Sequence, residues 1–244
     1  MPKLRPGFLC LLLAAFSPLA AAPPRAPSLH APWSRLLARY VDEEGLVAYR
    51  SLEREARPEL DAYLDRLART DPETFDRKEQ IAFWIDAYNA NVVRGVLSGQ
   101  TAESFLARKR FFSWWRFPVA GKERTLDEIE HEILRKRFSE PRVHFALVCA
   151  SRSCPKLRRE AYEGARLDEQ LDDQVRSFLL DPERNVLEPG RLRLSSIFRW
   201  FAEDFEKSGG LLPFLRRYVD IPGEPAIEYL PYDWSLNAQP GERP

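Results

Sequence analysis

The spacing of hydrophobic residues along the chain predicts a helix-rich protein. After Pro32, four apolar or aromatic residues follow a helical period: Trp33, Leu36, Leu37 and Tyr40. Residues 52–68 continue with a second helical face, and Asp71-Pro72 is a helix start signal. The run from 80 to 97 contains FWIDAYNA and is apolar enough to predict the central buried helix. Further helices are expected at 125–137, where Thr125 and Glu128 form a capping box, and at 167–180, 197–201 and 211–219.

Short strands are predicted between these helices. Residues 143–150 (VHFALVCA) are a continuous apolar run, which is typical of a buried strand. Residues 191–195 alternate in polarity, 226–230 resemble a last strand, and Gly121 marks a small hairpin. The pattern therefore predicts an α+β fold, a helix-rich single domain with a small, mainly antiparallel sheet.

The first residues predict export. A basic head with Lys3 and Arg5 precedes an apolar run through Phe16, and Ala20 to Ala22 offer small residues for cleavage. This order is that of a signal peptide, and the run is too short for a membrane span. We expect a signal peptide at 1–22 cleaved after Ala22, a Pro-rich tether at 23–30 and one globular domain at 31–244 in a periplasmic or secreted protein.

The composition of the chain limits the classes of partner and cofactor that we expect it to bind. The 37 basic and 37 acidic residues balance and are scattered, which does not favour nucleic acid. No later apolar run is long enough to span a membrane. No phosphate-binding loop, dinucleotide turn or zinc motif is present, and His131-Glu132 lacks the second histidine of HExxH. We expect no cofactor and no metal, and a small-molecule or peptide substrate; nothing in the sequence sets an oligomeric state.

The most concentrated chemistry lies at residues 144–155 (HFALVCASRSCP). Cys154 stands directly before Pro155, and a helix predicted over 155–162 would place its sulfur at a helix N-terminus, which stabilises a thiolate. His144 begins the predicted strand leading into this loop, and His131 is the other histidine of the domain. Cys154 is therefore the candidate nucleophile, with His144 or His131 as its base.

Three further residues could orient the base or stabilise charge: Asp86, Asn89 and Glu130. Structural interpretations remain open beside the catalytic one. Cys149 fits a small buried hydrophobe, and a Cys149–Cys154 disulfide fits an exported protein. His144 could donate to a backbone carbonyl, and Asp86 and Asn89 could hydrogen-bond loop backbone.

Several separated motifs resemble the domain-of-unknown-function 547 family. They are FWIDAYNA (83–90), TLDEIEHEILR (125–135), PRVHFALVCASRSCPKL (141–157), EAY (160–162), LSSIFRWFAEDF (194–205) and YDWSLN (232–237). Asp86 departs from the family pattern, where asparagine is expected. The resemblance implies an exported bacterial member, and the association of relatives with glutaredoxin-type domains hints at thiol chemistry. A cysteine at a helix start beside a histidine strand is similar to papain and transglutaminase folds, with rearranged chain order.

These features favour a thiol-dependent hydrolase or acyltransferase on amide or peptide bonds. Two alternatives differ from it in kind. The first is a non-enzymatic binding module in which a Cys149–Cys154 disulfide is structural. The second is a thiol redox protein that uses the same pair.

Overall fold

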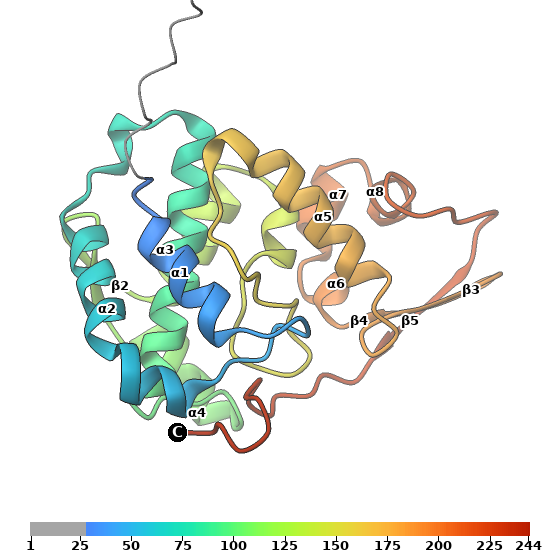
Figure 1. Cartoon of the computed structure of the whole chain (residues 1–244). Helices are drawn as coiled ribbons and strands as arrows, with labels where there is room; N and C mark the ends of the chain where they lie inside the picture. The colour runs from blue at the N-terminus through green and yellow to red at the C-terminus, as the bar shows by residue number, and fades with distance from the viewer. Residues whose placement is uncertain (1–27) are drawn as a thin grey trace, which may run out of the picture.

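The computed structural model describes residues 28–244, and its helix-rich α+β architecture confirms the predicted fold class (Figure 1). Among residues 28–244, four helices are long: α1 (Ala31–Tyr40), α2 (Tyr49–Arg69), α3 (Arg77–Leu97) and α5 (Leu167–Leu179). Four are short: α4 (Phe105–Arg108), α6 (Ile197–Trp200), α7 (Ala202–Lys207) and α8 (Leu211–Leu215). There are 3₁₀ turns at η1 (Pro72–Thr74), η4 (Pro141–Phe145) and η5 (Gly164–Arg166), and π-helices at η2 (Lys109–Trp114) and η3 (Glu128–Arg137). None of these described helices is long and apolar enough to cross a bilayer.

Helix α3 is the central buried helix, as the sequence predicts. Every side chain from Ile81 to Val93 is buried, which is typical of a helix that other elements surround. Asp76 caps its start by accepting from the Glu79 N–H, whereas Asp71 caps only the short turn η1. Helix α2 packs against both α1 and α3 (Figure 1).

Two small sheets complete the fold. Strands β1 (Phe117–Val119) and β2 (Lys122–Arg124) form the predicted antiparallel hairpin at Gly121. Strands β3 (Val186–Glu188), β4 (Arg191–Ser195) and β5 (Ala226–Leu230) form the second sheet, in which β3 pairs antiparallel with β4. Strand β5 pairs parallel with β4, so this sheet is mixed. The parallel pair requires a long crossover, and α6, α7 and α8 lie within it.

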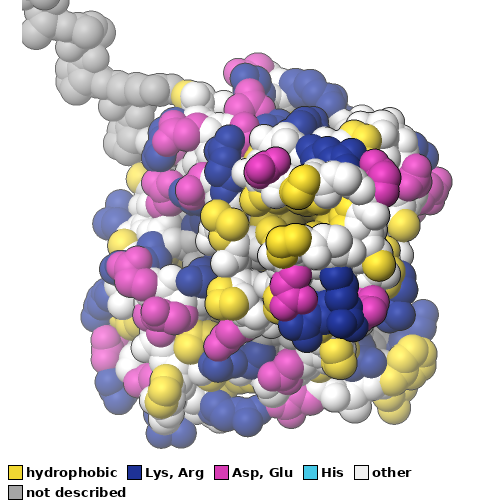
Figure 2. Space-filling view, turned by 90° about the vertical axis from the view of Figure 1, so that its right-hand side faces the viewer, with side chains coloured by type: hydrophobic (Ala, Val, Ile, Leu, Met, Phe, Trp, Pro, Cys, Tyr) yellow, Lys and Arg dark blue, Asp and Glu magenta, His cyan; other side chains and the backbone are white. Residues whose placement is uncertain are grey.

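The apolar side chains gather in two clusters. The larger cluster joins α1, α2, α3 and η3, and the smaller one packs α5 against β4 and α6–α8. Phe145 belongs to the smaller cluster although its neighbours in sequence belong to the larger. Figure 2 shows the face on the α7–α8 side, where positive and negative side chains are interspersed around a hollow with hydrophobic side chains. The segment around residue 145 therefore lies where the two clusters meet.

The strand predicted at 143–150 is wrong. Residues 141–145 form the 3₁₀ turn η4, and 146–150 are irregular. The run is buried, as predicted, but it has no neighbouring strand. Asn89 on α3 supplies the hydrogen bonds that a neighbouring strand would otherwise form. Its Nδ2 donates to the Ala146 carbonyl (2.9 Å), and its Oδ1 accepts from the Val148 N–H (2.9 Å). Burial explains the apolar run without fixing its backbone shape.

The helix predicted over 155–162 is also absent from the described chain. Side chains of other elements hold this segment instead, since Ser34 Oγ accepts from the Ala161 N–H and Asp86 Oδ1 from the Tyr162 N–H. Cys154 is therefore not at a helix N-terminus, and the papain-like placement of the cysteine is wrong.

The predicted boundary of the tether also needs correction. Residues 1–27 lie outside the described residues, including the expected signal peptide. Residues 28–30 belong to the fold, because His30 is fully buried where α1 begins. Its Nδ1 is 2.6 Å from the Tyr63 hydroxyl and 3.3 Å from Asp86 Oδ2. Burial lowers the pKa of His30 to about 4.

Candidate functional site

A pocket of about 170 Å³ lies where the two hydrophobic clusters meet. Its lining includes four residues named from the sequence: Glu130, His131, His144 and Cys154. Cys149 also lines it, together with residues of the C-terminal part such as Tyr232. The structure thus brings together both cysteines, both histidines of the predicted domain and one of the three candidate carboxylate or amide residues.

The loop that carries the cysteines is held by the C-terminal segment. Leu236 forms an isolated antiparallel bridge with Ser151. The Arg152 N–H donates to the Ser235 carbonyl (2.8 Å), and the Asn237 N–H donates to the Ala150 carbonyl (3.1 Å). Ala150, directly after Cys149, has φ of 60°, a region that non-glycine residues rarely adopt. Backbone strain of this kind clusters at functional sites, where surrounding contacts enforce it.

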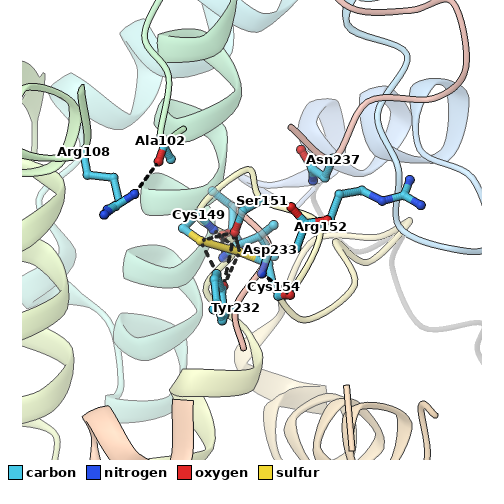
Figure 3. Close-up of a disulfide and its surroundings, with 12 residues drawn as sticks. Ala102, Arg108, Cys149, Ser151, Arg152, Cys154, Tyr232, Asp233 and Asn237 are labelled. Carbon is cyan, nitrogen blue, oxygen red and sulfur yellow. Dashed lines mark hydrogen bonds between the residues drawn. A yellow bond between two sulfur atoms is a disulfide. The ribbon is translucent and has the colours of Figure 1, made fainter. Parts of the chain in front are cut away.

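Cys149 and Cys154 are joined by a disulfide, with Cα atoms 6.3 Å apart (Figure 3). Three groups surround the Cys154 sulfur: the Cys149 N–H (2.9 Å), the Ser151 hydroxyl (3.3 Å) and the Tyr232 hydroxyl (3.3 Å). Burial raises the pKa of Tyr232 well above its ordinary value, so this hydroxyl keeps its proton. Cys154 is 3% exposed, whereas Cys149 is only partly buried. The loop therefore offers one accessible sulfur and one buried sulfur with hydrogen-bond donors around it.

His144 pairs with a carboxylate that the sequence did not single out. Its Nε2 is 2.7 Å from Oδ2 of Asp204, on α7, and its ring stacks on Phe201 with centroids 3.8 Å apart. The histidine side chain is 1% exposed. Its other ring nitrogen, Nδ1, has no hydrogen-bond partner within the described residues. Asp204 thus fixes the orientation of the ring through Nε2.

Arg135 is the second partner of Asp204. Its Nε and Nη2 donate to the two carboxylate oxygens at 2.6 and 3.2 Å. Burial would raise the pKa of Asp204, but the hydrogen bonds from His144 and Arg135 outweigh it and hold this pKa well below its ordinary value. Arg135 Nη1 also lies 2.9 Å from Nδ1 of His131. Because arginine only donates, His131 accepts at Nδ1, and a proton there would meet a cation.

The π-helix η3 presents the acidic side of the pocket. Thr125 and Glu128 form the predicted capping box: the Thr125 N–H donates to Glu128 Oε2 (3.1 Å), and the Glu128 N–H donates to Thr125 Oγ1 (3.2 Å). Asp127 and Glu130 line the pocket from this first turn. The Tyr88 hydroxyl of α3 donates to Glu130 (3.3 Å). π-helical turns are frequent at functional sites.

Asp86 and Asn89 do not line the pocket. Asp86 is buried against His30 and the Tyr162 N–H, and burial raises its pKa well above the ordinary value. Asn89 holds the backbone that leads from His144 to Cys149. Both contacts are of the loop-anchoring kind that the sequence left open. No cluster of three or more metal-ligating side chains suited to an ion occurs among residues 28–244.

Three residues at the site were missed: Asp204, Tyr232 and Ser151. All three fall inside motifs that carry the family resemblance, LSSIFRWFAEDF, YDWSLN and HFALVCASRSCP. The motifs were the available signal, since no periodicity or spacing relates residue 204 to residue 144.

Comparison with known families gives one match. Residues 72–179 match the family described as protein of unknown function, DUF547, which confirms the resemblance; the motifs at 194–205 and 232–237 lie outside the match. No curated protein and no solved structure matches the chain. The matched region contains His131, His144 and both cysteines, and it ends before Asp204 and Tyr232.

Proposed function

We propose that this chain, whose residues 72–179 belong to the DUF547 family, is a thiol-dependent hydrolase or acyltransferase for amide or peptide bonds. The observation that carries the proposal is that His144, which pairs with Asp204, lines the same pocket as Cys154. A nucleophilic sulfur and a histidine oriented by a carboxylate are the parts that acyl transfer through a thioester requires.

Cys154 serves as the nucleophile after a dithiol reductant has opened the disulfide. The donors around its sulfur stabilise the thiolate, which lowers a thiol pKa in the way that the predicted helix N-terminus would have done. The thiolate attacks the substrate carbonyl carbon, and the C–N bond then breaks.

His144 acts across the pocket. Neither His131 nor His144 forms a hydrogen bond to a sulfur within the described residues, so the thiolate is activated by its own loop and the histidine serves the leaving group. The protonated ring donates from Nδ1 to the departing amine, and the neutral ring then takes a proton from water, or from an acceptor nucleophile, that attacks the thioester. Asp204 stabilises the protonated ring.

A second candidate function is thiol–disulfide exchange. It is favoured by the disulfide itself, with Cys149 as the accessible sulfur and Cys154 as the buried one. A substrate thiolate would attack Cys149, and Cys154 would leave as a thiolate with donors already in place. The exchange function fits the oxidising compartment that the expected signal peptide implies, whereas the hydrolase additionally requires a dithiol reductant there.

Single-cysteine variants separate the two functions. In Cys149→Ser no internal disulfide forms, so a hydrolase keeps its nucleophile and works without reductant, whereas an exchange protein loses its activity. We expect Cys154 in this variant to be alkylated rapidly, with an apparent thiol pKa below the ordinary value of about 8.5. Slow alkylation with an ordinary thiol pKa would refute the hydrolase proposal. If reduction followed by alkylation of Cys149 or Cys154 changes neither the hydrolase nor the exchange activity, neither thiol function holds. A binding module is then the remaining function.

A further inference from the structure

The pocket beside the cysteines combines aromatic walls with negative charge. Six aromatic side chains line it: Tyr88, Phe112, Trp200, Phe201, Tyr232 and Trp234. Two carboxylates also line it: Glu130 of η3 and Asp127, the residue that precedes η3. No lysine or arginine side chain is among the described residues of this lining, and the guanidinium groups of Arg108 and Arg135 stack on two of its rings, Trp234 and Phe201. Aromatic faces and carboxylates are the groups that attract an organic cation.

Three of the aromatic rings form one continuous wall. The Tyr232 and Trp234 centroids are 4.5 Å apart, and the Trp200 centroid lies 4.8 Å from Tyr232 and 5.6 Å from Trp234. Trp200 is 43% exposed, so a large apolar surface remains open beside the pocket. Tyr232 also contacts the Cys154 sulfur, which places this wall directly next to the reacting group.

The two carboxylates lack a permanent cation within the described chain. Arg135, on the same helix, is bound to Asp204. Asp127 accepts from the Ser113 hydroxyl and lies 3.9 Å from His131 Nε2, and Glu130 accepts only from the Tyr88 hydroxyl. A buried polar atom at the pocket is also without a partner, since His144 is 3% exposed and its Nδ1 is unpaired. Asp127, Glu130 and His144 Nδ1 can therefore bind a ligand that carries hydrogen-bond donors and a positive charge.

We propose that the pocket binds a protonated amine on the substrate, so that the proposed thiol chemistry acts on peptides that carry a lysine-like ammonium group next to the reacting bond. The position of the reacting bond in this inference rests on the proposed function. The positive charge of the ligand is inferred from the pocket lining itself. The volume of about 170 Å³ is below the roughly 300 to 1,000 Å³ of pockets that enclose a whole small ligand, so one side chain fits rather than an entire peptide. The ammonium group reaches Glu130 and Asp127, and its methylene stem packs on the aromatic wall.

Binding can be measured without catalysis. In the Cys149→Ser/Cys154→Ser double variant of the full chain no thiol is left, and the pocket lining is otherwise unchanged. The probes are N-acetyl-lysine amide and its neutral counterpart N-acetyl-norleucine amide, followed by tryptophan fluorescence and calorimetry. We expect the lysine probe to bind at least tenfold more tightly than the norleucine probe.

Glu130→Gln tests the charge while keeping an acceptor for Tyr88. We expect it to weaken the lysine probe about tenfold and to leave the norleucine probe unchanged. The matched control is Glu132→Gln on the same helix, whose exposed carboxylate pairs with Lys136 and does not line the pocket. Equal affinity for the two probes, no binding of either, or no effect of Glu130→Gln would each overturn the proposal. Because the assay needs no sulfur, such a failure is distinct from a failure of thiol reactivity in Cys149→Ser.

Discussion

Asp204→Asn is the most informative single change at this site. Asp204 accepts three short contacts: His144 Nε2 at 2.7 Å and the Arg135 nitrogens at 2.6 and 3.2 Å. Asparagine keeps the shape but has one acceptor oxygen and turns an N–H₂ group toward these donors. The variant therefore removes the negative charge and leaves at least one buried N–H group without a partner.

The expected loss in the free energy of unfolding follows from the burial of Asp204 and Arg135. Hydrogen bonds to a charged group contribute about 1.5 to 3 kcal/mol each when buried. Asp204 is 14% and Arg135 20% exposed, so solvent weakens part of the interaction. We expect a loss of about 2 to 3 kcal/mol in the free energy of unfolding, which corresponds to about 5 to 10 °C in melting temperature for a chain of this size.

The loss should depend on pH in one direction. The pKa of Asp204 is lowered in the folded protein, so its contribution to stability is fully present above the ordinary carboxyl pKa of about 3.9 and is lost as pH falls through the folded-state value. Urea unfolding of both proteins between pH 7 and pH 2 checks this, and the gap between them should narrow in acid. The control is Glu203→Gln, the exposed neighbour that pairs with Lys207, which should leave the midpoint unchanged. A constant gap across this range, or none at pH 7, would refute the reasoning.

Three further changes test other parts of the structure. Asn89→Ala should lower the free energy of unfolding by about 2 to 4 kcal/mol in urea titration, because two buried backbone groups of the loop lose their partners. Gly164→Ala should cost about 1 to 3 kcal/mol, since a Cβ would lie 2.6 Å from the Glu79 backbone nitrogen; an unchanged melting temperature would contradict the close approach. Ser151→Ala should raise the apparent thiol pKa of Cys154 in the reduced protein, measured by alkylation rate against pH, because the Ser151 hydroxyl donates to Tyr232, whose own hydroxyl donates to the sulfur.

Local signals predicted the helices and the hairpin well. The period of apolar residues located α1, α2, α3 and α5, and the Thr125–Glu128 capping box marked the start of η3. Each of these signals depends only on residues a few positions apart, so the local sequence contains all the information needed to recognise it. The π-helical form of η3 was not predicted, because apolar spacing does not distinguish it from an α-helix.

The failures concern segments shaped by distant groups. Residues 143–150 are apolar and buried, yet their backbone is fixed by Asn89, more than fifty positions earlier. The segment after Cys154 carries a helix start signal, but Arg184 instead donates to the Cys154 carbonyl (2.7 Å) and Asp86 accepts from the Tyr162 N–H. When side chains from other elements satisfy a backbone, local propensity no longer decides its form.

The candidate site shows the same contrast between residues that the local sequence identifies and residues that only the fold identifies. Cys154 and His144 were found because the chemistry of their side chains is visible in isolation. Asp204 was not, since acidic residues are common and only the fold brings position 204 to His144. Asp86 was chosen for its place on a buried helix, and its contact proved to be with His30 instead.

The site therefore depends on more chain than the DUF547 match covers. The match supplies the sulfurs and the histidines and ends at residue 179, whereas Asp204 and Tyr232 follow it. The two parts are tied by packing as well as by chemistry, because Phe145 beside His144 lies in the smaller hydrophobic cluster with residues 192–221. A chain ending at 179 would leave Phe145 exposed and His144 without its carboxylate. The unit that can perform the proposed chemistry is consequently the described domain through its C-terminal segment, and the matched region alone lacks the groups that orient the base and hold the cysteine loop.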